Sequence, residues 1–488
     1  MNVALAVKES AKCGKIIKIE ENQNDFNKTS NYYNNIKIDS NCDDNINKNG
    51  NLLQIKETSK LKINKSKELF EEAQKLIPGQ SQTLSKGYTQ FVQGVSPIFV
   101  QKGKGSHVFD PDGNEFIDYI LALGPITLGY NYPKTNFAII KQLGEGITFS
   151  LPHPLEVELA KDIVETIPCA EMVRFGKNGT DVTSAAVKIA RAYTKKEKIA
   201  YCGYHGGSAD WFGITTALNK GVPKCMGDLI IGFEYNNIKS LENIFAEHQG
   251  EIATVIMEPV VFEEPKDDFL QKVKDLAHKH GAVLIFDEMV TGFRVSLGGA
   301  QEYYNVTPDL ATFGKGVANG MPLSILCGKK EIMEECENVF FSMSFGGEVC
   351  SLAAAKTTIQ EFKEKNVIAH CWKQGKKIKE KYNQLSKQYG LYSFTKCIGL
   401  DVHNKFEFND KDGDEWYDLK SLFIQETAKM GILCSTVNNF CLSHSDEDIN
   451  KTLNAFEIIF KIMKDGIGNN NIKELLEGIP VSPVFRKT

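Results

Sequence analysis

The spacing of apolar positions changes along the chain and separates its two ends from its middle. Residues 22–51 show little helical or strand periodicity and are rich in asparagine, so we expect residues 1–62 to form a disordered, low-complexity extension. From Ser66, apolar residues at helical spacing predict an amphipathic helix that ends at Pro78 and Gly79. Short strands are expected next, at 98–100 and 106–109.

The middle of the chain alternates short apolar runs with amphipathic segments. Helices are expected at 182–193 and 269–280, among others. The expected strands are 172–175, 198–202, 229–233, 253–257, 282–286 and 324–327. Apolar strands that alternate with helices are typical of a mostly parallel sheet covered on both faces.

These patterns predict an α/β fold with two domains after the extension. The large domain is expected at 120–361 and contains the mostly parallel sheet. Long helical patterns with few strands follow from about residue 362. We therefore expect a smaller α+β domain that combines an N-terminal segment, 63–119, with a C-terminal segment, 362–488.

Composition excludes several functional classes. The chain has 57 Lys+Arg against 62 Asp+Glu, a formal net charge of −5, which gives no electrostatic reason to expect nucleic-acid binding. Apolar runs are too short to span a bilayer, and the first residues lack the pattern of an export signal or transit peptide. The 12 cysteines show no Cys-x-x-Cys pair or zinc spacing, so we expect no metal site and reduced thiols in a cytoplasmic protein.

Two motifs place a carboxylate and an amine near strand ends. Asp287 follows the apolar strand 282–286, and ligands in open α/β sheets bind at the carboxyl edge. A helix cap or a structural ion pair is the alternative role for this acid. Lys315 lies between two glycines, which leaves its amine accessible for Schiff-base chemistry, although many such lysines are ordinary loop residues.

Two further motifs suit a phosphate and a planar ring. Gly179 and Thr180 directly precede the expected helix 182–193, where unpaired N–H groups attract anions; a simple helix cap is the alternative. Tyr204 and His205 follow the strand 198–202 and could stack on a planar ligand and hydrogen-bond to it, or form a glycine-rich turn with a packed tyrosine. In this order, the four motifs match pyridoxal 5′-phosphate (PLP).

The motifs together resemble a known family. The chain from Ser66 to Thr488 is similar to class III aminotransferases of PLP fold type I, in particular to the glutamate-1-semialdehyde 2,1-aminomutase branch. The segments that carry the resemblance are DPDGNEFIDY (110–119), NGTDVTSAAVKIARAYT (178–194), GYHG (203–206), MEPV (257–260), LIFDEMVTGFR (284–294), PDLATFGKGVANGMP (308–322) and SHSDEDI (443–449).

The resemblance implies a role for each matching residue. Lys315 would be the Schiff-base lysine and proton shuttle, and Asp287 would pair with the ring nitrogen of PLP. Ser344 occupies the place of a threonine that reaches the phosphate of the partner subunit, which implies a homodimer with shared active sites. The remaining cofactor-binding residues would be Gly179 and Thr180 at the phosphate, Tyr204 and His205 at the ring, and Met289 beneath it.

The sequence departs from the aminomutase pattern at the substrate end. Lys86 replaces an arginine and Thr83 replaces a serine. The segment 122–125 lacks an aromatic residue that the pattern contains, and Glu263 stands where an asparagine is expected. We treat Lys86, Thr83 and Glu263 as candidate substrate-binding residues. Arg294 either pairs with an acid such as Glu258 or binds substrate, and we expect a structural role for it.

These departures leave the reaction open. Segments at 298–310, 341–348 and 479–487 resemble class III aminotransferases of surface-sugar biosynthesis, so we expect an enzyme that transfers an amino group from a small-molecule donor to a carbonyl acceptor, a keto-sugar or sugar acid. The alternative is glutamate-1-semialdehyde 2,1-aminomutase, which gives 5-aminolevulinate without an external donor. A non-catalytic PLP-fold binding module is a third hypothesis, and PLP decarboxylases and racemases share the same core.

Overall fold

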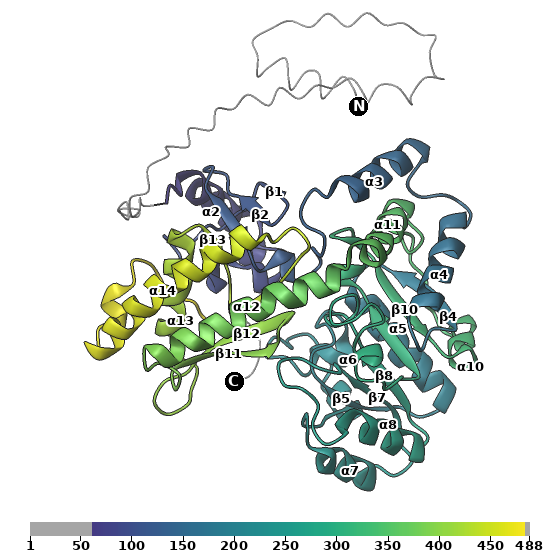
Figure 1. The fold of residues 1–488 in the computed structure, drawn as a ribbon. Helices are drawn as coiled ribbons and strands as arrows, with labels where there is room; N and C mark the ends of the chain where they lie inside the picture. Colours follow the sequence, from purple (N-terminus) through teal and green to yellow (C-terminus); the bar gives the residue numbers. More distant parts are fainter. Residues whose placement is uncertain (1–60, 484–488) are drawn as a thin grey trace, which may run out of the picture. The chain divides into compact units, whose positions relative to one another are not determined.

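A seven-stranded sheet forms the centre of the computed structural model, which describes residues 61–483 (Figure 1). The strand order is β4-β10-β9-β8-β7-β5-β6. Only β10 is antiparallel to its neighbours within this sheet, so the prediction of a mostly parallel sheet is confirmed. The strands are β4 (Met172–Gly176), β5 (Lys198–Cys202), β6 (Ile230–Gly232), β7 (Ile252–Met257), β8 (Val283–Asp287), β9 (Leu310–Phe313) and β10 (Ser324–Gly328).

Helices cover both faces of this sheet because its central strands are apolar at nearly every position. Strands β7 and β8 are buried at every residue. Successive side chains point to opposite faces, so Ile256 and Ile285 pack with α5 (Gly179–Thr194). Their neighbours Val255 and Leu284 pack with α7 (Ile238–Glu247) and α8 (Phe269–Lys279) on the other face. The apolar runs of the sequence therefore correspond to doubly covered strands.

Two smaller sheets combine distant parts of the chain. The four-stranded sheet joins β1 (Lys102–Lys104), β2 (His107–Phe109) and β3 (Glu115–Asp118) to the C-terminal strand β13 (Ile432–Leu433), which is parallel to β3. The three-stranded sheet contains β11 (Thr395–Leu400), β12 (His403–Phe408) and β14 (Val437–Asn439). N- and C-terminal segments thus share one sheet, although the domain boundaries proposed from the sequence stay a prediction.

The remaining helices are distributed along the described chain. Short helices α6 (Asp210–Gly213), α9 (Ala300–Tyr303) and α10 (Lys330–Met333) follow strands or loops of the central sheet. The longer helices are α2 (Asn64–Leu76), α3 (Pro133–Glu145), α4 (Pro154–Thr166), α11 (Val349–Lys365), α12 (Val367–Gln388), α13 (Tyr417–Lys429) and α14 (Asp446–Gly468). Aromatic rings hold the C-terminal group together: Tyr382 of α12 stacks on Phe406 of β12 with ring centroids 4.2 Å apart. No helix within 61–483 has the length and apolar character that crossing a bilayer requires.

The expected strand at 98–100 is wrong. This segment is irregular, and pairing begins only at Lys102, opposite Phe109. Pro97 lacks an N–H group, and no strand in the described part of the chain pairs with residues 98–100. The expected extension at 1–62 lies outside the described residues except for its last two.

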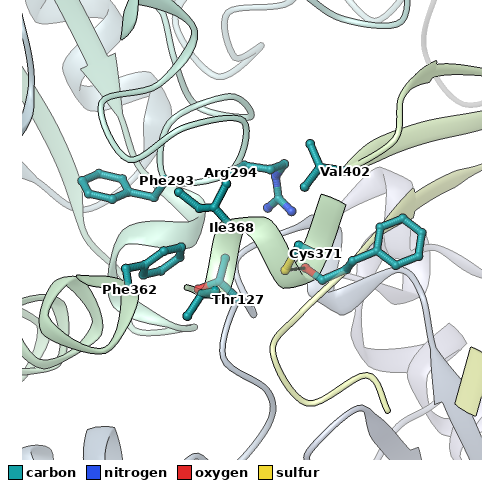
Figure 2. A pocket seen from close by; sticks show the side chains of 9 residues that line it. Thr127, Phe293, Arg294, Phe362, Ile368, Cys371 and Val402 are labelled. Carbon is teal, nitrogen blue, oxygen red and sulfur yellow. Dashed lines mark hydrogen bonds between the residues drawn. The ribbon is translucent and has the colours of Figure 1, made fainter. Parts of the chain in front are cut away.

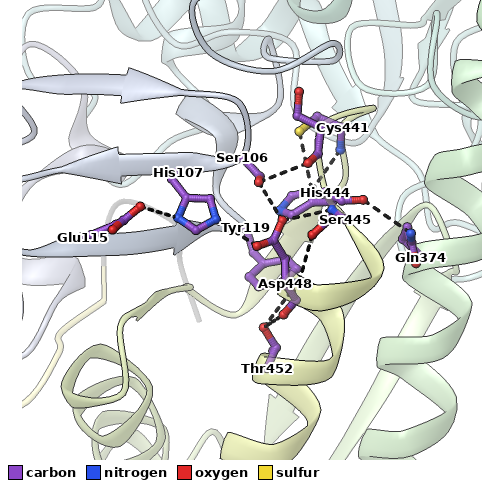
Figure 3. A network of polar contacts seen from close by, with 11 residues as sticks. Ser106, His107, Glu115, Tyr119, Gln374, Cys441, His444, Ser445, Asp448 and Thr452 are labelled. Atoms are coloured by element: carbon purple, nitrogen blue, oxygen red, sulfur yellow. Dashed lines mark hydrogen bonds and ion pairs between the residues drawn. The ribbon is translucent and has the colours of Figure 1, made fainter. Parts of the chain in front are cut away.

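A polar network joins the N-terminal strands to the last long helix (Figure 3). His107 Nε2 lies 2.8 Å from Asp448 Oδ1 of α14, and His107 Nδ1 lies 2.9 Å from Glu115 Oε1. Ser106 Oγ donates a hydrogen bond of 2.9 Å to Asp448 Oδ2. The hydrogen bond to Asp448 raises the pKa of His107 against the opposing effect of burial. The imidazolium form of His107 is therefore the form that best ties β2 to α14.

Replacing His107 with glutamine tests this tie through its pH dependence. Because the pKa of His107 is raised in the folded state, its contribution is full below the pKa of the unfolded chain and is lost as pH rises through the folded value. We expect His107→Gln to destabilise the protein by about 1 kcal/mol at pH 5.5 and by less at pH 8.5. Urea unfolding midpoints at both pH values provide the measurement, and an equal loss at both would contradict the prediction.

Candidate active site

The carboxylate of Asp287 is held at the end of the central strand β8. Its side chain is almost fully buried, and Oδ2 lies 2.8 Å from His205 Nδ1. Oδ1 accepts hydrogen bonds from Met289 N at 3.1 Å and Thr312 Oγ1 at 3.2 Å. A carboxylate has about four acceptor positions, so Asp287 retains capacity for one further donor. The strand-end acid predicted from the sequence is thus fixed in one orientation.

His205 reaches Asp287 from the loop that follows β5. Because a carboxylate only accepts hydrogen bonds, Nδ1 of His205 carries the proton between them. Nε2 is buried and has no hydrogen-bond partner among the described residues, and the ring lies close to Trp211 and Phe212. The peptide oxygen of His205 accepts a hydrogen bond from Thr183 Oγ1 of α5 at 2.9 Å. His205 is therefore held both by its peptide oxygen and by its ring.

The first turn of α5 forms a cradle beside these residues. A Cβ at Gly179 would lie 3.1 Å from Met289 Sδ, and a Cβ at Gly206 would lie 2.3 Å from Thr180 Oγ1. Glycine is therefore required at 206, where φ is +90°. Gly179 begins the helix, so its N–H and that of Thr180 have no intrahelical partner, an arrangement that favours a bound anion. The phosphate-binding role of Gly179 and Thr180 stays a prediction.

Lys315 lies after β9 in a turn with left-handed backbone. Its φ is +38°, an uncommon value for a residue with a side chain. Burial lowers the pKa of the Lys315 amine and the charge of Arg294 lowers it further, whereas Glu258 and Asp287 oppose the shift. A lowered pKa gives more of the neutral amine, the form that attacks an aldehyde.

Tyr204 and Glu258 lie together at the ends of β5 and β7. Tyr204 N donates a hydrogen bond of 2.8 Å to Glu258 Oε2, and the Tyr204 ring is 38% exposed. Phe212 contacts this ring edge-on at 5.5 Å. Burial and the nearby charge of Asp287 raise the pKa of Glu258. Glu258 was not among the predicted site residues, although its position directly after a buried strand gives the same signal as Asp287.

Arg294 makes backbone contacts instead of an ion pair. Its Nε donates to Val290 O at 2.9 Å and its Nη2 to Gly124 O, and no carboxylate within 61–483 forms a salt bridge with it. Burial lowers its pKa to about 10. Figure 2 shows Arg294 at a cavity of about 10 Å³, room for one water molecule. The structural role expected for Arg294 agrees with these contacts, and pairing with Glu258 does not occur.

The segment that Arg294 holds contains an unusual turn. Leu121, Ala122 and Leu123 have φ of +48°, +57° and +73°, and Gly124 follows at +101°. Left-handed conformation costs about 1–3 kcal/mol for each residue with a side chain, and it persists only where the surroundings impose it. Asp118 Oδ1 accepts the N–H groups of Ile120 and Leu121, at 2.7 and 3.1 Å. This turn occupies 121–124, at the position of the missing aromatic residue noted in the sequence.

The predicted substrate-binding residues are more dispersed. Lys86 is exposed at the end of a short 3₁₀ helix, Leu84–Lys86. Thr83 is half-buried, and its N–H donates to Ser81 Oγ at 3.1 Å. Glu263 is exposed and pairs with Lys266 on the surface. None of these contacts joins the three residues to Asp287 or Lys315, so their role toward substrate stays a prediction.

Other residues near the site were not predicted. His403 of β12 is buried, and its Nδ1 lies 3.1 Å from Asn439 Oδ1. Burial, together with the charges of Arg294 and Lys315, lowers the pKa of His403 to about 3. Asn319 hydrogen-bonds to the backbone at 127–129. Ser344 is exposed. In the part of the chain that the structure describes, no group of His, Cys, Asp and Glu side chains is arranged to hold a metal ion.

Comparison with known proteins agrees with this geometry. The family model for class III aminotransferases matches residues 89–460. A glutamate-1-semialdehyde 2,1-aminomutase of Persephonella marina is 36% identical over 429 residues, which cover 82% of this chain and 99% of the relative. A 3-aminobutyryl-CoA aminotransferase of Cloacimonas acidaminovorans is 35% identical over 407 residues, 81% of this chain and 96% of the relative.

A solved structure shares the fold. The FumI protein of Sphingopyxis sp. MTA144, in its PLP internal aldimine form, superimposes with a TM-score of 0.77 at 26% identity, covering 83% of this chain and 97% of that chain. The family resemblance and the PLP fold type I architecture predicted from the sequence are confirmed. The chain belongs to the class III aminotransferases and is a PLP-dependent transaminase or aminomutase.

Proposed function

We propose that this protein is a transaminase that moves an amino group from an external donor to a carbonyl acceptor of the keto-sugar or sugar-acid class. The observation that carries the proposal is the contrast between the two ends of the site. The cofactor end holds Asp287, His205 and Lys315 in a fixed arrangement, whereas the substrate end differs from the aminomutase pattern. PLP, when bound, supplies the electron sink that stabilises a carbanion at the substrate carbon.

Each residue at the cofactor end would have one task. Lys315 would bind the aldehyde carbon of PLP. Once the amine of the substrate has displaced it, the freed Lys315 amine would take a proton from the substrate carbon and deliver it to the former aldehyde carbon of the cofactor. Asp287, held by His205 Nδ1 at 2.8 Å, would keep a proton on the ring nitrogen. Gly179 and Thr180 would bind the phosphate through backbone N–H groups. Tyr204 would cover one face of the ring and Met289 the other.

The substrate end offers neutral hydrogen-bonding groups, which support a hydroxylated acceptor. Asn439 Nδ2 donates to Ile120 O at 3.1 Å, so its Oδ1 faces His403 and the Nδ1 of His403 carries the proton. Nε2 of His403 is then an acceptor. A neutral imidazole accepts from a hydroxyl group but gives no charge attraction to a carboxylate. The exposed Lys86 is the cation that we propose for an acidic group of the substrate.

The aminomutase remains the second candidate, because relatives with that name match nearly their whole length. Against it, lysine at 86 lacks the bidentate geometry of arginine for a carboxylate. The aminobutyryl-CoA aminotransferase, at similar identity, is a relative whose name implies an external donor.

We further propose a homodimer in which Ser344 reaches the phosphate of the partner subunit. Apolar side chains are exposed along α3, α4 and the loops beside them, including Phe137 at 61%, Leu151 at 79% and Val157 at 60%. Phe340 and Phe345, close to Ser344 in the chain, are 85% and 62% exposed. Apolar patches of this extent mark protein interfaces, and a second copy would bury them next to the Ser344 loop.

Removing the Lys315 amine should abolish turnover. We expect Lys315→Ala to lower the rate by about a thousandfold or more, since both the covalent bond and the proton shuttle are lost. Lys279→Ala, at the exposed end of α8, is the matched control and should retain the wild-type rate. Borohydride reduction of the wild type followed by peptide mapping should label Lys315. A label on another lysine, or an active Lys315→Ala protein, would refute the assignment.

A donor panel separates the two candidate reactions. We expect glutamate or another amino acid to change the absorption spectrum of the PLP form, and a keto-sugar then to restore it. With glutamate-1-semialdehyde alone we expect no 5-aminolevulinate. Formation of 5-aminolevulinate without a donor would overturn the transaminase proposal in favour of the aminomutase. No response to any donor would count against the transaminase, because the aminomutase needs no external donor.

Charges on the apolar face should dissociate the proposed dimer. We expect the wild type to sediment as a dimer and the Phe137→Asp/Leu151→Asp protein as a monomer with reduced activity, because burying a carboxylate in the interface is unfavourable. Ile458→Asp, on the partly exposed face of α14, is the control and should remain dimeric. Sedimentation velocity at micromolar concentration is the measurement, and a monomeric wild type would contradict the proposal.

A further inference from the structure

The turn that carries Lys315 is joined to the segment 127–129 by four hydrogen bonds. Asn319 Oδ1 accepts the N–H of Thr127 at 3.0 Å and the N–H of Leu128 at 2.9 Å. Asn319 Nδ2 donates to Gly129 O at 3.0 Å. Thr127 Oγ1 donates to Gly316 O, also at 3.0 Å. One amide side chain thus makes three of the contacts between two segments nearly 200 residues apart.

Both joined segments contain left-handed backbone. Lys315 and Asn319 bound one turn, with φ of +38° and +44°, and the turn at 121–124 leads directly into the segment 127–129. The two segments also touch closely, because a Cβ at Gly316 would lie 2.8 Å from Thr127 Cγ2. Left-handed residues with side chains need such external support to persist. The hydrogen bonds of Asn319 link the Lys315 turn to the segment 127–129, which begins three residues after the turn at 121–124.

Asparagine suits this position for two reasons. It is one of the few residues with a side chain that adopts left-handed backbone at small cost. Its amide also presents an acceptor and a donor in a fixed plane, which match two N–H groups and one carbonyl of 127–129. Glycine would also allow the left-handed backbone but would make no side-chain hydrogen bonds. The side chain of Asn319 is therefore what joins the two segments.

We propose that Asn319 is a positioning residue, which holds the Lys315 turn in register with the substrate-side turn at 121–124. The proposal rests on the role proposed for Lys315. Asn319 would act through backbone geometry, without touching cofactor or substrate, by fixing where the Lys315 amine stands relative to the groups at the ends of β5, β7 and β8. A small displacement of a reacting group is enough to slow an enzyme reaction by an order of magnitude or more.

The test compares variants that separate backbone strain from hydrogen bonding. Asn319→Gly keeps left-handed backbone accessible and removes the side-chain bonds, and Asn319→Asp keeps the two acceptor contacts while losing the donor to Gly129. Asn366→Gly is the matched control, because Asn366 also has positive φ, +49°, without a side-chain cap bond. All are prepared as full-length protein loaded with PLP. The readouts are kcat and KM separately, and the pH titration of the absorbance from the lysine–PLP linkage.

We expect Asn319→Gly to lower kcat about tenfold, with little change in KM, and to shift the midpoint of the titration. The kcat and the midpoint of Asn319→Asp should lie between those of Asn319→Gly and the wild type. Asn366→Gly should match the wild type in both. An Asn319→Gly protein with the same titration midpoint and the same kcat as the wild type would overturn the proposal, whatever its melting temperature. If Asn319→Gly does not fold, Thr127→Val decides, because it removes only the bond to Gly316 O and should shift the titration in the same direction. If the wild type itself shows no lysine–PLP absorbance, the proposed function fails instead.

Discussion

The buried carboxylate of Asp287 sets the constraint on which the active site depends. A charge at the end of a strand that is buried at every position is tolerated only where donors surround it. The chain meets this requirement from three strand ends: His205 after β5, Thr312 on β9 and the peptide N–H of Met289 after β8 itself. The same contacts that stabilise the charge also fix its direction, so the acid is oriented before any ligand arrives.

The cofactor end of the site was predictable because its signals are local. A continuous apolar run followed by an acid indicates both a strand and the chemistry at its end, and the six strands predicted for the central sheet agree with the structure within one or two residues. Glu258, an acid directly after the apolar strand β7, follows the same rule. The strand β9 was missed because its four residues, Leu310–Phe313, are too short to show a period and lie directly before the lysine motif.

The substrate end was less predictable because its contacts are non-local. Strand β14, which carries Asn439, pairs with β12, and the Asn439 amide bonds to Ile120 more than 300 residues earlier. No spacing along the sequence announces such a contact. The left-handed turn at 121–124 also has no glycine before position 124, so the usual sequence sign of positive φ is absent. The Asp118, Arg294 and Asn439 contacts that impose this turn exist only in the folded chain.

This difference explains why the sequence identifies the family but leaves the substrate open. The cofactor end is built at one edge of the central sheet. Losing Asp287 there leaves the buried N–H of His205 Nδ1 without its acceptor, and a side chain at Gly206 brings its Cβ into collision with Thr180. At the substrate end, Lys86 and Glu263 are exposed and can change without disturbing the core. The charges beside Lys315 act on its amine: burial and the backbone-bound Arg294 lower the pKa of Lys315, whereas Glu258 and Asp287 raise it. A substrate carboxylate would need a cation such as Lys86, whereas a hydroxylated acceptor needs only hydrogen-bond partners such as His403.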